Sequence, residues 1–153
     1  EEFRFALSGN YERGDFGVMY SGYYRFFRDA DSNREDFDDR HEWVAAIRAL
    51  WFNGAFTPGI ESSIQVLRPN GLNPRTDKQQ VGKIAQFAII PALSLGERTG
   101  SYNRPQLQLI GALTALDQGA RDLFPADDRR AQTSLAWFFG ARAEWWFGRG
   151  GGY

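Results

Sequence analysis

The run from Leu135 to Phe147 constrains the fold more than any other stretch of this chain. Successive side chains of a β-strand point to opposite faces, so odd and even positions of the run separate. The apolar face consists of Leu135, Trp137, Phe139, Ala141, Ala143, Trp145 and Phe147. The other face consists of Ala136, Phe138, Gly140, Arg142, Glu144 and Trp146. A soluble strand would bury the apolar face, whereas a strand of an outer-membrane barrel would turn it to lipid and its partner face to a watery lumen.

Aromatic residues at both ends of the apolar face favour the membrane interpretation, because they collect at the two bilayer interfaces. The same alternation recurs in residues 3–12, 16–26, 43–51, 60–66, 79–95 and 102–116. It predicts an all-β fold, an antiparallel transmembrane β-barrel of the outer-membrane type, with seven strands counted and eight possible. The phase of the fifth strand is ambiguous around Gln86 and Phe87, which predicts a bulge.

The predicted strands are joined alternately by short and long connections. Short turns fall near residues 13–15, 53–59 and 96–100, and polar loops near 28–40, 68–78 and 117–131. Outer-membrane barrels have short periplasmic turns and long external loops. We therefore expect a periplasmic C-terminus and essentially no helix.

Composition excludes several classes of function. The 153 residues carry a formal net charge of −1, which leaves no basic excess for nucleic-acid phosphates. The absence of cysteine excludes disulfides, thiolate metal sites and cysteine nucleophiles. The aspartate-rich loop opens like a calcium loop but has Arg34 and Arg40 where glycine and glutamate are needed. We expect no enzyme, no metal and no cofactor.

Two segments resemble a known family. The run from Trp137 to Phe147 is similar to the closing strand of the maltoporins, which ends in a Gly-Ala-x-x-Glu-x-Trp-Trp type of sequence. The segment from Ser101 to Leu109 resembles their aromatic-x-Arg-Pro-x-Leu-Arg strand entry, and weaker likenesses cover residues 55–58 and 83–85. The resemblance spans about residues 41–147, and the first forty residues carry no matching motif.

The resemblance implies a sugar-specific porin of the bacterial outer membrane. Its expected partners are maltooligosaccharide-like carbohydrates, the lipid bilayer with lipopolysaccharide, and two further copies in a homotrimer. By resemblance, Trp146 and Tyr102 stack on sugar rings, and the period-two count places both on the lumen face. An aromatic ring binds the C–H face of a pyranose by dispersion and burial. The alternative for Trp146 is an interfacial anchor near the strand end.

The predicted polar lumen lining consists of Arg104, Gln106, Gln108, Arg142 and Glu144. Arg48, Glu42 and Glu61 are further charges expected to point inward. These groups could bond sugar hydroxyls, and structural ion pairs across the interior are the alternative.

Residues 1–147 are expected to form a β-barrel domain or the C-terminal portion of a larger barrel, followed by a glycine-rich tail at 148–153. Seven strands with a periplasmic C-terminus conflict with the even strand number of exported barrels, so we favour the C-terminal portion of a larger sugar porin. The first alternative is a free-standing barrel of about eight strands, whose filled interior would exclude sugars. The second is a soluble all-β module whose aromatic face is a dry core.

Overall fold

The computed structural model describes residues 1–28, 39–73, 75–95, 100–102 and 105–145. Eight strands account for most of them: β1 Glu2–Arg13, β2 Phe16–Phe27, β3 Arg40–Trp51, β4 Gly59–Pro69, β5 Gly82–Ile90, β6 Ala92–Ser94, β7 Gln106–Leu116 and β8 Leu135–Glu144. Two short helices, α1 Gln118–Asp122 and α2 Arg129–Gln132, lie between β7 and β8.

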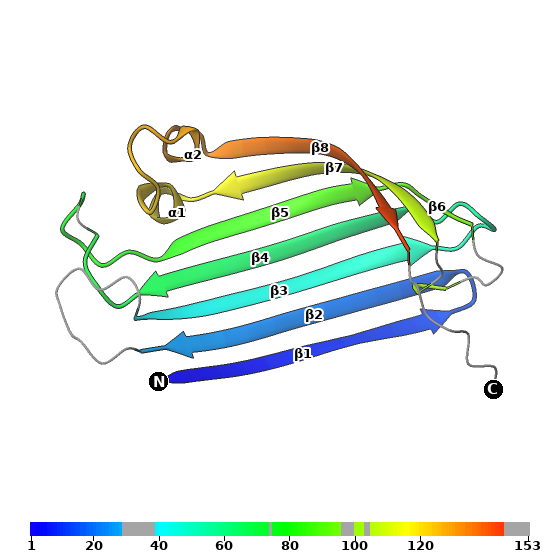
Figure 1. Ribbon diagram of the computed structural model, residues 1–153, viewed down its shortest axis with the longest axis horizontal. Coiled ribbons are helices and arrows are strands. Elements are labelled where there is room, and N and C mark those ends of the chain that lie inside the picture. The colour runs from blue at the N-terminus through cyan, green and yellow to red at the C-terminus, as the bar shows by residue number, and fades with distance from the viewer. Residues whose placement is uncertain (29–38, 74, 96–99, 103–104, 146–153) are drawn as a thin grey trace.

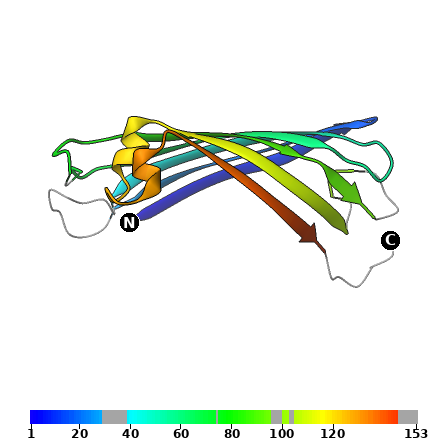
Figure 2. The same ribbon diagram turned by 90° about the horizontal axis from the view of Figure 1, so that it is seen from above.

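All eight strands belong to one antiparallel sheet (Figure 1). The hydrogen-bonded order follows the chain from β1 to β5, continues with β7, and ends with β8 and the short β6, which both pair with β7. The sheet is curved, and β8 turns away from the plane of the other strands (Figure 2). Among the described residues β1 pairs only with β2 and β8 only with β7, so the all-β antiparallel prediction is confirmed while the sheet is not closed into a barrel.

The fifth predicted strand is divided at Pro91 into β5 and β6, which explains the count of eight strands. The predicted bulge at Gln86 is wrong, because Gln86 pairs with Thr114 and Ala92 with Gln108 in one unbroken register. The carbonyl of Pro91 still accepts a 3.0 Å hydrogen bond from the amide of Leu109. Proline has no N–H to return, so the ladder loses a bond there without shifting its phase.

One face of the sheet is apolar across every long strand. A single register row joins Leu7, Gly22, Ala45, Ile64, Ala85, Ala115 and Leu135. We call the face containing this row the outer face and the opposite one the inner face. Most large outer-face side chains are 37–76% exposed: Phe3, Phe5, Leu7, Tyr11, Phe16, Tyr20, Trp43, Trp51, Ile47, Ile60, Ile64, Phe87, Ile89, Leu93, Leu107, Leu109, Leu113, Leu135, Trp137 and Phe139. The predicted alternation of these strands is confirmed.

The two ends of the sheet differ in their connections. At one end β1 and β2 are joined by a two-residue turn, in which Gly14 has φ +57°. Glycine at the first central position is typical of a type II′ hairpin turn. The opposite end carries the longer connections, including the whole segment 117–134 with α1 and α2 (Figure 1).

The expectation of essentially no helix is wrong for the connection between β7 and β8. Asp117 caps α1 by accepting a hydrogen bond from the amide of Ala120, and Asp128 caps α2 by accepting one from the amide of Arg130. Aspartate is a preferred N-cap because it satisfies a free amide of the first turn. Both helices are one turn long, and in the described part of the chain no helix is long and apolar enough to cross a membrane.

Two glycines allow α1 to lie directly against the inner face of β5. A Cβ on Gly82 would lie 2.8 Å from Leu123 and 2.9 Å from the backbone of Ala120. A Cβ on Gly119 would lie 2.1 Å from the carbonyl oxygen of Val81, which is far inside van der Waals contact. The segment 117–134 therefore folds over the inner face at the end of the sheet with long connections.

Candidate functional site

The inner face lines a partly open cavity of about 400 Å³ between the two halves of the sheet. Its polar lining comes from β1 to β4, from the turn before β7 and from β8: Ser8, Ser21, Arg48, Glu61, Tyr102, Arg142 and Glu144. The sheet is curved (Figure 2), and residues of β8 line this space together with residues of β1 and β2, although these strands are not paired in the sheet. We call this space the central cavity.

Tyr102 reaches the central cavity from a turn and not from a strand. The prediction that the sixth strand begins at Tyr102 is wrong, because β7 begins at Gln106. Residues 100–102 instead fold over the inner face toward β1, where the amide of Ser101 donates a 2.8 Å hydrogen bond to the Glu12 carboxylate. Tyr102 is 51% exposed and contributes to the lining of the cavity.

A chain of side-chain hydrogen bonds connects the β6 end of the sheet to Arg142. The amide of Gln106 donates to Ser94 Oγ at 2.8 Å, and the amide of Gln108 donates to Gln106 Oε1 at 2.6 Å. The guanidinium of Arg142 then donates to Gln108 Oε1 at 2.8 Å and lies 3.2 Å from the carboxylate of Glu144. Gln106 and Gln108 are each 5% exposed, so their contact with the cavity is indirect, through Arg142.

Other charged side chains of the inner face form ion pairs, some within one strand and some across strands. Arg48 Nε of β3 donates to Glu61 of β4 at 2.8 Å at the wall of the central cavity. Nearer the long connections, Arg25 Nε lies 2.6 Å from the Glu2 carboxylate and Arg25 also lies 3.6 Å from Glu42. Partly exposed pairs of this kind contribute little stability but fix the positions of the charges.

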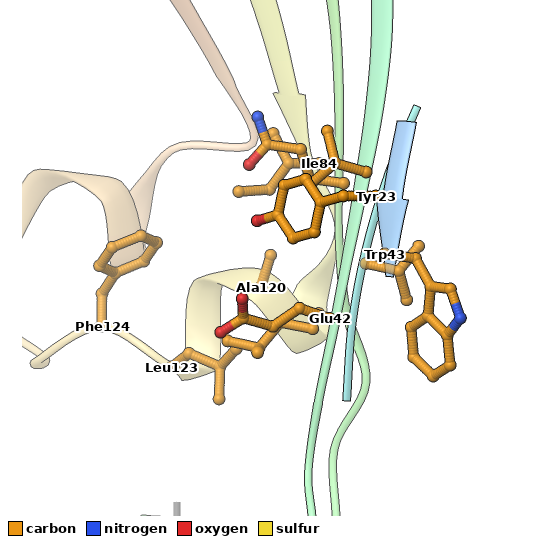
Figure 3. A pocket seen from close by; sticks show the side chains of 12 residues that line it. Tyr23, Glu42, Trp43, Ile84, Ala120, Leu123 and Phe124 are labelled. Carbon is orange, nitrogen blue, oxygen red and sulfur yellow. The ribbon is translucent and has the colours of Figure 1, made fainter. Parts of the chain in front are cut away.

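A second cavity of about 420 Å³ lies between the inner face and segment 117–134. Figure 3 shows Tyr23 and Glu42 on one side of this space and Phe124 and Leu123 on the other, with Trp43 on the opposite face of the sheet. Tyr23 is 42% exposed. The alternation of β2 already placed Tyr23 on the inner face, but no local sequence signal places Phe124 opposite it, because that depends on how α1 docks.

Asp122 fastens α1 to the connection between β4 and β5. Its carboxylate accepts hydrogen bonds from Gln118 at 2.7 Å and from Gln80 at 2.8 Å, and Arg75 lies 2.8 Å away. The amide of Asn73 donates to the backbone carbonyl of Asp122 at 2.7 Å. Partial desolvation acts to raise the pKa of Asp122, but the hydrogen bonds from Gln118 and Gln80 and the charge of Arg75 outweigh it and lower this pKa below its ordinary value.

This lowered pKa predicts that acid releases segment 117–134. A carboxyl whose folded pKa is depressed stabilises the fold above its unfolded pKa, near 4, and the contribution is lost as the pH falls through the folded value. We expect the hydrogen-exchange protection factors of residues 117–124, taken relative to the intrinsic exchange rate at each pH, to be high at pH 6 and to fall once the pH is below about 4.

The matched variants are Asp122→Asn and Asp128→Asn. Asp122→Asn should raise exchange already at pH 6 and remove most of the acid dependence of α1. Asp128, whose pKa the Arg130 side chain and amide lower to about 2, caps α2 and touches none of the groups around Asp122. Exchange in α1 that responds equally to both variants would contradict the role of Asp122.

Some predicted residues lie outside the described part of the chain. These are Trp146, Arg104 and most of the aspartate-rich loop, together with the tail 148–153. The closing strand β8 ends at Glu144, and the last described residue, Trp145, is 62% exposed. The structure therefore brings Tyr102, Arg142 and Glu144 together around one cavity, with Gln106 and Gln108 behind Arg142.

Comparison with known proteins gives a family. A family model described as LamB porin matches residues 1–147, which includes the first forty residues that carry no recognisable motif. No curated protein and no solved structure matches the chain. Porins are channels and not enzymes, and this match supports a porin-type channel of the bacterial outer membrane. With almost its whole length matched, the chain belongs to the LamB porin family.

Proposed function

We propose that the chain forms part of the wall of an outer-membrane channel through which maltodextrin-like sugars diffuse. The observation that carries the proposal is the division of the sheet into an apolar outer face and an inner face with aromatic and paired polar groups around a cavity. Soluble monomers rarely expose a continuous apolar patch larger than a few hundred Å². A lipid-facing outer face accounts for this exposure.

The open edges of β1 and β8 also bear on the proposal. Unpaired strand edges are not tolerated in the hydrocarbon region, because their amides and carbonyls have no water to bond. We therefore propose that further strands complete the wall, as in the C-terminal portion of a larger sugar porin. The free-standing barrel of about eight strands is the second candidate, and the buried Ser94–Gln106–Gln108 chain is the kind of packing that its filled interior would have.

The inner face has the chemistry that sugars require. Tyr102, and by resemblance Trp146, would stack on pyranose rings, while Arg48, Glu61, Arg142 and Glu144 would exchange hydrogen bonds with hydroxyls. Tyr23 and Phe124 offer a further aromatic pair where the long connections begin. By resemblance, three such channels assemble as a trimer, and the long connections face the cell exterior.

Current through single channels in a planar bilayer tests the function. The purified protein should conduct ions, and maltooligosaccharides added on either side should block that current reversibly. Ion conduction without block by any sugar would favour an unspecific pore, and absence of conduction would favour the filled barrel.

Substitution of two neighbouring tryptophans tests the stacking role. We expect Trp146→Ala to weaken sugar block by about 5-fold to 150-fold, since loss of one aromatic stacking platform costs about 1–3 kcal/mol. Trp145→Ala is the matched control, because alternation places residue 145 on the outer face with Ala141 and Ala143. Equal loss of block in the two variants would mean that the strand register beyond Glu144 is different from the one predicted.

A further inference from the structure

The charges of the outer face are confined to its ends. Among the strand residues that the structure describes, the outer face carries Arg13 at the end with short turns, and Arg68 and Lys83 at the end with long connections. No aspartate or glutamate of a described strand points to this face. The outer face is therefore apolar in the middle. It is basic at the end where the long connections begin, and its described strands carry no acidic side chain there.

Arg68 and Lys83 are adjacent on this face. Lys83 pairs with Val66 in the β4–β5 register, so Arg68 is its diagonal neighbour two residues further along β4. Diagonal neighbours in an antiparallel pair lie about 7–8 Å apart, a distance that two long basic side chains can close around one anion. Both residues are exposed, and the described residues give neither an ion-pair partner.

A group of aromatic side chains lies directly beside the two cations. His41 is the register partner of Arg68, and its ring stacks on Trp43 with centroids 5.7 Å apart and planes at 11°. The hydroxyl of Tyr24 lies 2.9 Å from His41 Nδ1, and the Phe26 ring packs against the imidazole with ring centroids 4.9 Å apart. Tyrosine and tryptophan with one apolar and one polar end are typical of the depth at which lipid headgroups begin.

We propose that Arg68 and Lys83 bind a phosphate group of lipopolysaccharide, the glycolipid of the outer leaflet, with its acyl chains lying along the apolar rows below. The inference rests on the proposed function, which places the long connections outside the cell. A guanidinium bonds phosphate through a planar pair of N–H groups, and an ammonium adds a compact charge. Clustered basic residues at a membrane interface are the usual means of selecting phosphorylated headgroups.

Two carboxylates in the adjoining segments are engaged elsewhere. Asp117 Oδ1 accepts hydrogen bonds from the amides of Lys83 and Ala120, at 3.0 Å and 2.7 Å, as the cap of α1. Asp39 is 8% exposed and lies 3.9 Å from Arg28. In the described part of the chain, no ion pair joins either carboxylate to the side chain of Arg68 or Lys83, and no described carboxylate there competes with a phosphate for these two cations.

Lipid binding to the full protein in bilayer discs of neutral lipid tests the site. We expect diphosphorylated lipid A to bind wild type, and the double variant Arg68→Gln, Lys83→Gln to bind it about 30-fold more weakly, since each interfacial cation contributes about 1 kcal/mol. Arg13→Gln is the matched control, because it removes a cation from the same face at its opposite end. Lipid A without phosphates should bind wild type as weakly as the phosphorylated form binds the double variant.

Three results would overturn the site: unchanged lipid A affinity in the double variant, an equal loss in Arg13→Gln, or equally tight binding of phosphatidylglycerol by wild type. Sugar block of channel current, measured on the same preparations, separates this inference from the proposed function. If the wild-type protein binds lipid A through these residues but sugars do not block its current, the proposed function is contradicted and the lipid site is not. The double variant should keep the wild-type block, because both residues lie on the face opposite the central cavity.

Discussion

Replacing Ile64 by arginine is expected to destabilise the membrane-inserted protein by about 2–4 kcal/mol, the cost of a cation near the middle of a lipid-facing strand. Ile64 lies in the middle of β4, is 49% exposed and belongs to the row that crosses every long strand. A difference of this size lowers the folding equilibrium constant by about 30-fold or more. Urea-induced unfolding from lipid vesicles measures this loss of stability as a shift of the unfolding transition to a lower urea concentration.

The matched control is Ser63→Arg, one residue earlier on the same strand. Ser63 points to the inner face, where the register places it opposite Ala46 and Gln86. An arginine there lies beside Gln86 and, on the same face of β4, Glu61 and Gln65, so it should shift the transition much less. Similar shifts for the two variants would mean that lipid does not cover the outer face, and a protein that stays monodisperse without detergent would favour the soluble module.

Gly119→Ala is expected to displace α1 from β5 although alanine favours helix formation. Gly119 does not have a positive φ, so helix propensity alone would predict a gain of about 1 kcal/mol. The added Cβ, however, would lie 2.1 Å from the carbonyl oxygen of Val81, and a backbone oxygen cannot move aside like the end of a side chain. Segment 117–134 must therefore shift away from the inner face.

Hydrogen exchange of residues 117–134 and single-channel conductance both report on this displacement. Exchange should accelerate in Gly119→Ala, and conductance should rise if the segment narrows the channel. Gln118→Ala is the control, since residue 118 is exposed on the same helix and its substitution removes side-chain hydrogen bonds to Asp122 and Arg121 without adding an atom against Val81. Protection of the segment in Gly119→Ala at the wild-type level would show that the helix does not dock against Val81.

Much of the sheet could be predicted because the face to which each strand residue points depends on the local sequence. Period-two alternation predicted the faces of β8 and of the strands before it, since each strand must present one apolar side whatever its neighbours are. Alternation also placed Arg142 and Glu144 on the inner face, and in the structure both residues line the central cavity. The predicted bulge failed because polar Gln86 and apolar Phe87 suit their faces in a regular register, and the irregularity comes from Pro91.

The rest depends on contacts between distant parts of the chain. Tyr102 reaches the cavity because Glu12, at the far end of the sheet in sequence, holds the turn that contains it. Phe124 faces Tyr23 because α1 fits against two glycines and because Asn73, Arg75 and Gln80 hold Asp122. The helices capped by Asp117 and Asp128 were not predicted, because helices of a single turn gain their stability from such tertiary contacts and not from local propensity.

The pairing of inner-face charges affects which solutes the channel wall can distinguish by their charge. The described strands place equal numbers of arginines and glutamates on this face: Arg4, Arg25, Arg40, Arg48 and Arg142, with Glu2, Glu12, Glu42, Glu61 and Glu144. Opposite charges a few ångströms apart cancel at longer range, and salt screens the remainder within about 10 Å at 0.1 M. Such a wall exerts little net field on a passing solute, so neither cations nor anions would be enriched beside it. Selectivity would then come from ring stacking and hydroxyl geometry, which suits uncharged solutes.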